Sequence, residues 1–122
     1  MKLGLESYSV RNSALDPIGV LKLAADWGLA GVLFELSPFK SFRDADLEAT
    51  RQCACERNLY LHFGMGSIFH WHPMAEQGRQ LLAEAGYETN VSEAQTVIQH
   101  LEVARKLGSP ILRCVAGNLF VR

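Results

Sequence analysis

Four ionisable side chains stand in the second halves of short apolar segments: Glu6, Glu35, His62 and Arg113. Burying an unpaired charge is costly, so each must be paired, hydrogen-bonded or directed into a solvated cavity. If the segments are parallel strands, their carboxyl ends meet at the edge where parallel α/β proteins bind ligands. We therefore take these four as candidate substrate-binding residues; no catalytic residue is assigned.

Each of these residues also has a structural interpretation. A Glu or Arg within a strand can pair with a neighbour, and a single His can bond to a backbone carbonyl. The strand register decides between the two interpretations, because a slip of one residue turns a side chain to the other face.

The sequence "FHWHP" adds His70 and His72, which flank Trp71. An H-x-H pair can bind a divalent metal when both rings point to one side. This pair lies beyond the expected strand with no carboxylate close in sequence, so we predict no metal ligands here. Instead we expect His70 and Trp71 to contact a sugar from a lid, with surface packing as the alternative.

Apolar runs alternate with helical segments, which predicts parallel strands joined by right-handed crossovers. Asp16 and Pro17 are typical of a helix start, as are Ser92 and Gln95 in capping-box spacing. The expected strands are 2–10, 31–36, 59–64 and 110–117, and the expected helices are 16–28, 44–58 and 92–108. A long connection, residues 65–90, holds a short helix between Pro73 and Gly86 and is a candidate lid.

Composition narrows the function classes. A net charge of −1 gives no electrostatic signal for nucleic acid or an anionic membrane. The first ten residues lack the apolar core of a signal peptide, so the expected location is cytoplasmic. Three cysteines, an odd number without zinc-site spacing, favour inert thiols.

Four stretches together resemble the N-terminal half of the xylose-isomerase-like barrels, the superfamily that holds sugar phosphate isomerases and epimerases. They are "KLGLESYSVR", "AADWGLAGVLFEL" with an acid near its end, "LYLHFG" with a His near its end, and "ARKLGSPILRCVAG". The resemblance implies an α/β fold of parallel (β/α) units, four of them in residues 1–122. A complete barrel takes about 250 residues, so this chain would be half of one.

The resemblance also implies a reaction. Its members bind a divalent metal (Mn, Mg, Co or Zn) and move a proton next to a sugar carbonyl. In the family the metal ligands come mostly from later strands, so they would lie outside this chain. Only a substrate-pocket role for Glu35 and His62 is carried over. The chain is then expected to be an inactive fragment of a sugar or sugar phosphate isomerase or epimerase, self-associating through its open sheet edges.

Two alternatives stay open. One is a dehydratase or lyase of sugar-derived acids on the same barrel, which only the later strands could distinguish. The other is a non-catalytic small α/β module of flavodoxin-like type. A metal-ligand role for His62, as implied by the nuclease branch of the superfamily, also stays open, although the absence of basic character disfavours a nuclease.

Overall fold

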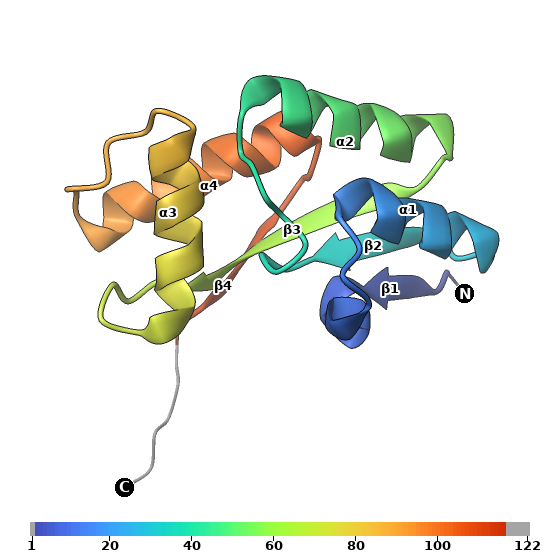
Figure 1. The fold of residues 1–122 in the computed structure, drawn as a ribbon, viewed down its shortest axis with the longest axis horizontal. Coiled ribbons are helices and arrows are strands. Elements are labelled where there is room, and N and C mark those ends of the chain that lie inside the picture. The colour runs from blue at the N-terminus through green and yellow to red at the C-terminus, as the bar shows by residue number, and fades with distance from the viewer. Residues whose placement is uncertain (1, 117–122) are drawn as a thin grey trace, which may run out of the picture.

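The computed structural model describes residues 2–116 and contains a four-stranded, all-parallel sheet in the order β1-β2-β3-β4. Figure 1 shows the strands side by side, with the helices returning the chain from each strand to the next. The strands are β1 (Gly4–Glu6), β2 (Gly31–Phe34), β3 (Tyr60–Ser67) and β4 (Leu112–Val115). The helices are η1 (Ser7–Ser13), α1 (Pro17–Asp26), α2 (Asp44–Glu56), η2 (Pro73–Ala75), α3 (Glu76–Glu84) and α4 (Glu93–Leu107).

The predicted α/β class with parallel strands is confirmed. Sequential order is the order in which a barrel is wound, since each crossover adds a strand on the same side. A flavodoxin-like sheet has the order 2-1-3-4-5 instead. The flavodoxin-like topology left open by the sequence is therefore wrong for this part of the chain.

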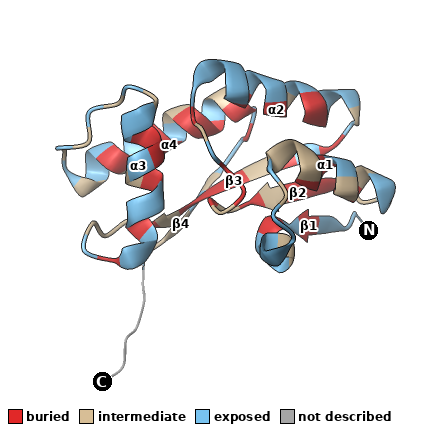
Figure 2. Cartoon of the chain, in the orientation of Figure 1, coloured by how far each residue is buried: buried red, intermediate tan, exposed pale blue. Residues whose placement is uncertain are grey.

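One face of the sheet carries the hydrophobic core. Leu5, Val32 and Leu61 are in register, as are Phe34 and Phe63 on the next inward row, and all five are buried. They pack with buried side chains of α1, α2 and α4, such as Leu21, Leu47 and Val103. Figure 2 shows this buried layer between the helices and the strands. Phe39 and Phe42, in the connection after β2, close it with edge-on contacts to Phe63.

α1 and α4 begin and end where the capping residues predicted. The Asp16 carboxylate accepts a hydrogen bond of 2.7 Å from the Gly19 amide, and Pro17 is the first residue of α1. The Ser92 hydroxyl accepts one of 3.1 Å from the Gln95 amide. α4 ends at Gly108, whose φ of 79° is in the left-handed region that glycine tolerates best.

The bounds of all four strands differ from expectation. β2 ends at Phe34 and not at Leu36, so Glu35 lies beyond the strand. β1 ends at Glu6, because Ser7–Ser13 turns into a 3₁₀ helix. β3 continues to Ser67, so His62 is its third residue and not its last. β4 starts at Leu112, and the predicted end of that strand at Gly117 lies outside the described residues.

The long connection after β3 folds into η2 and α3, as the Pro73-to-Gly86 pattern predicts. α3 lies close to α4 at Gly78, where an added Cβ would be 2.8 Å from Nε2 of His100. His100 is buried, stacks on Phe63 and makes a 2.9 Å hydrogen bond between Nδ1 and the Thr96 carbonyl oxygen. Its Nε2 atom is buried without a hydrogen-bond partner.

Within residues 2–116, no helix combines the length and the apolar character needed to cross a membrane. Cys53, Cys55 and Cys114 are unpaired thiols.

His100 predicts a pH-dependent stability. Burial lowers the pKa of its imidazole, and the bond to the Thr96 carbonyl offsets part of that effect. Below the unfolded-state pKa of about 6.5, the unfolded chain binds a proton at this imidazole that the native chain does not bind. The free energy of unfolding therefore decreases as the pH is lowered. In urea titrations between pH 7.5 and 5.5, we expect His100→Asn to lose less stability than the wild type. Equal losses in the two proteins would contradict this.

Candidate functional site

Among residues 2–116, no helix covers the sheet face opposite α1, α2 and α4, and we call it the open face. Its residues are those that alternate with the core: Gly4 and Glu6, Gly31 and Leu33, Tyr60, His62 and Gly64, and Arg113. Glu6, Leu33 and His62 form one row across three strands, and Arg113 is paired with Gly64 one row further along. The parallel register thus brings three predicted site residues, Glu6, His62 and Arg113, to the same face.

An ion pair crosses this face from one edge strand to the other. Nη2 of Arg113 on β4 lies 3.4 Å from Oε1 of Glu6 on β1. Strands lie about 4.8 Å apart, so two residues three strands apart meet only if both side chains lean across the sheet. Gly64 provides the space, since an added Cβ there would come within 3.2 Å of Nε of Arg113.

This ion pair is held weakly. Both side chains are 45% exposed, and exposed pairs contribute between nothing and about 1 kcal/mol to stability. Either group can therefore exchange its partner for a ligand at small cost. The structural interpretation of Glu6 and Arg113 and the ligand-binding one are compatible here.

Tyr60 and His62 form an aromatic surface beside the pair. The Tyr60 ring lies over Gly31 and its hydroxyl over Gly4, since a Cβ on either glycine would overlap it. The His62 and Tyr60 ring centroids are 4.8 Å apart with the planes tilted by 44°. Tyr60 was not predicted as a site residue; its signal was the spacing of two from His62, which places both on one face of a strand.

Glu35 lies just beyond β2 and acts as a clamp between strand ends. Its carboxylate accepts hydrogen bonds from the Ser37 amide (2.9 Å), the Ser37 hydroxyl and the Ser7 hydroxyl. Its own amide donates to the Ser7 oxygen at 2.9 Å. These contacts fasten the carboxyl ends of β1 and β2 together. A substrate-binding role for Glu35 stays a prediction.

His70 and Trp71, which the sequence predicts to contact a ligand from a lid, have different surroundings. Nε2 of His70 lies 2.8 Å from the Thr96 hydroxyl, and the His70 amide donates to Glu93, so the ring is fastened to the start of α4. Trp71 is 67% exposed and stacks on Phe69 at 5.7 Å. His72 is buried and caps η2. His70 is thus fixed by protein contacts, whereas Trp71 presents an exposed ring.

No metal centre is assembled from the part of the chain that the structure describes: no three of its His, Cys, Asp or Glu side chains come together. The arrangement on the open face instead suits hydrogen bonding to a neutral polar ligand, because it combines an acceptor, a ring nitrogen and a donor.

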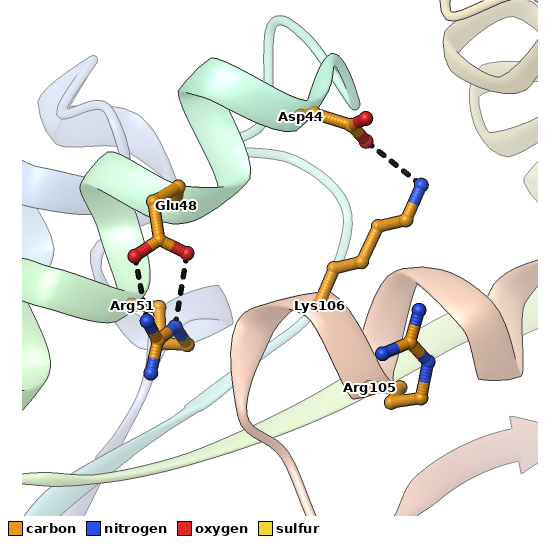
Figure 3. Close-up of a pocket in the computed structure, with 5 residues that line it drawn as sticks. All are labelled: Asp44, Glu48, Arg51, Arg105 and Lys106. Atoms are coloured by element: carbon orange, nitrogen blue, oxygen red, sulfur yellow. Dashed lines mark hydrogen bonds and ion pairs between the residues drawn. The ribbon is translucent and has the colours of Figure 1, made fainter.

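A depression of about 490 Å³ lies on the helix layer between α2 and α4 (Figure 3). Its charges are already paired: Arg51 with Glu48, and Lys106 with Asp44. The bond from Arg51 lowers the pKa of Glu48, and the bond to Asp44 raises the pKa of Lys106. Both effects favour the ionised forms, so we interpret this depression as a solvated, salt-bridged surface between helices.

No known protein family matches this chain, and neither a characterised protein nor a solved structure shows significant similarity to it.

The packing of Tyr60 over glycine predicts a coupled pair of substitutions. Gly31→Ala should destabilise the fold by about 1–3 kcal/mol, the usual cost of overpacking, because the new methyl group meets the Tyr60 ring. In a Tyr60→Ala background the same substitution should cost much less. Urea unfolding of the four proteins measures this coupling, and additive effects would show that Tyr60 does not lie over Gly31.

Proposed function

We propose that the open face binds a sugar or a related polyhydroxylated molecule, and that this chain is the substrate-holding half of a sugar isomerase or epimerase with a (β/α)₈ barrel. The observation that carries the proposal is the gathering of Glu6, His62 and Arg113, from three strands, on the open face. In a closed barrel this face lines the interior, and its carboxyl end is the ligand mouth.

The chemistry of the three groups supports a ligand rich in hydroxyls. The Glu6 carboxylate accepts hydrogen bonds, Arg113 donates several, and the His62 imidazole can do either. The exposed pair between Glu6 and Arg113 can open toward a hydroxyl and a carbonyl oxygen of one ligand. The Tyr60 ring beside His62 offers an apolar surface for the C–H side of a sugar ring.

The proposed reaction is proton transfer next to a carbonyl. A divalent metal would polarise the carbonyl and hydroxyl oxygens in such a reaction. The donor groups of residues 2–116 do not form a set that would hold one, so the proposal assigns this chain no metal ligand and no proton-transfer residue. Its residues bind and orient the substrate, and the 122-residue chain alone is expected to show no turnover.

Trp71, with its exposed ring, is the residue of the connection after β3 that would cover the ligand. The location proposed for the protein is the cytoplasm, where small sugar metabolites are interconverted.

The test is ligand binding by the isotope-labelled chain, followed by the ¹H–¹⁵N shifts of its amides. A ketose and its aldose isomer should shift the amides of Glu6, His62, Gly64 and Arg113. Glu6→Gln and His62→Ala should each weaken binding by about tenfold, since a hydrogen bond to a charged or polar partner contributes on the order of 1.5 kcal/mol.

Glu48→Gln is the matched control, because Glu48 lies on α2, among the helices on the other side of the sheet, and carries the same charge. It should leave sugar binding unchanged. Shifts confined to the helix layer, or equal losses in the Glu6 and Glu48 variants, would refute the proposal. Binding to the open face without turnover in any longer form of the protein would favour a binding module over an enzyme.

A further inference from the structure

A small cavity of about 150 Å³ lies at the carboxyl end of β1 and β2, apart from the open face. Its wall includes Ser7, the residue after β1, and Ser37, three residues after β2. The carboxyl end of a parallel sheet is where α/β proteins bind ligands, so the position of this cavity is itself informative.

Among the described residues that line the cavity, two are cations and none is acidic. They are Arg11, at the end of η1, and Lys40, in the connection before α2. The remaining wall is mostly apolar and includes Val10, Leu15, Val20 and Pro38. Apolar walls with low dielectric strengthen the field of such charges and raise the local concentration of anions.

The donors of the two cations are largely unused. Arg11 donates one hydrogen bond, from Nη1 to the Tyr8 carbonyl oxygen at 2.8 Å. Its guanidinium lies over the Tyr8 ring, 3.9 Å from the ring centroid. These contacts orient the group while leaving most of its five N–H donors. Lys40 is exposed and forms no hydrogen bond or ion pair with the described residues, so its three donors are available.

Glu35 is a negative charge bonded to two residues of the cavity wall. It does not line the cavity, and its oxygens are bonded to Ser37 and Ser7. Because the hydroxyls of Ser7 and Ser37 are already bonded to Glu35, Arg11 and Lys40 are the groups that can bind a ligand in this cavity. Arg11 and Lys40 carry +2 together against the single negative charge of Glu35 behind the two serines, so the cavity keeps a net positive charge that favours an anion.

We propose that this cavity binds a phosphate group through Arg11 and Lys40. A guanidinium fork and an ammonium are the side chains that recognise phosphate most often. Lys40 is shared with a second cavity, of about 290 Å³, whose wall includes residues of α1 and α2 and the carboxylates of Asp16 and Asp46, which suit the hydroxyl groups of a ligand and not a second phosphate. The phosphate can therefore be inorganic or belong to a monoester whose organic part extends into that second cavity. This site stands whether or not the open face binds sugar.

The experiment titrates the chain with inorganic phosphate, a sugar phosphate monoester and the unphosphorylated sugar, at constant ionic strength. Phosphate should saturably shift the amides of Ser7, Arg11 and Lys40. Lys40→Gln and Arg11→Gln should each weaken phosphate binding at least about tenfold, as expected for loss of a charge-assisted hydrogen bond. Lys40→Gln removes no hydrogen bond or ion pair among the described residues, so it tests the site even if the Arg11 variant unfolds.

Lys22→Gln is the control, because Lys22 is an exposed residue of α1 with the same charge and does not line the cavity. It should bind phosphate as the wild type does. Tighter binding of the monoester than of inorganic phosphate would identify an ester as the ligand, and equal binding would identify free phosphate; both support the site. Absence of saturable phosphate binding, or equal weakening by Lys22→Gln and Lys40→Gln, would overturn it.

The control sugar separates this proposal from the proposed function. If the wild type binds phosphate but does not bind the unphosphorylated sugar, the sugar site alone is refuted. Sugar binding retained without phosphate binding refutes the phosphate site alone.

Discussion

The handedness of the crossovers is the constraint on which the rest of the structure depends. Parallel strands in sequential order, joined by right-handed connections, place α1, α2 and α4 on the same side of the sheet. The opposite face is then left to side chains alone, and its polar residues can meet. Were the order flavodoxin-like, helices would cover both faces, and Glu6, His62 and Arg113 would be buried charges in need of other partners.

Glycines give the open face its shape. Tyr60 can lie flat because Gly4 and Gly31 have no side chains, and Arg113 can lean toward Glu6 because it passes over Gly64. The glycines thus act through the space they leave and not through unusual backbone angles. The same arrangement leaves the Glu6–Arg113 pair exposed, so it adds little stability and stays available to a ligand. At the strand ends, Ser7 and Glu35 form a tighter hydrogen-bonded clamp, which fixes β1 beside β2 close to the proposed phosphate cavity.

Much of the fold could be predicted because its signals are local. Asp16, Pro17, Ser92 and Gly108 mark helix ends through contacts within a few residues, and the alternation of helices and strands implies parallel strands. The sequence predicted that Glu6, His62 and Arg113 could share a face. It did not show which face each side chain is on, because that depends on the exact strand register. The surroundings of His70 and the role of Tyr60 could not be predicted. They depend on Thr96 and on Gly4 and Gly31, which are 26 residues or more away in the chain.

A NOESY spectrum of the labelled 122-residue chain tests the central claim most directly. It reports which residues of neighbouring strands are paired and on which side of the sheet their side chains lie. We expect contacts between neighbouring strands at Leu5 and Val32, at Val32 and Leu61, and at Phe63 and Leu112, in the pattern of parallel strands. The rings of His62 and Tyr60 should also be in contact on the face away from α2. An antiparallel pattern, or a register that turns His62 toward the helices while Glu6 faces away from them, would contradict the account.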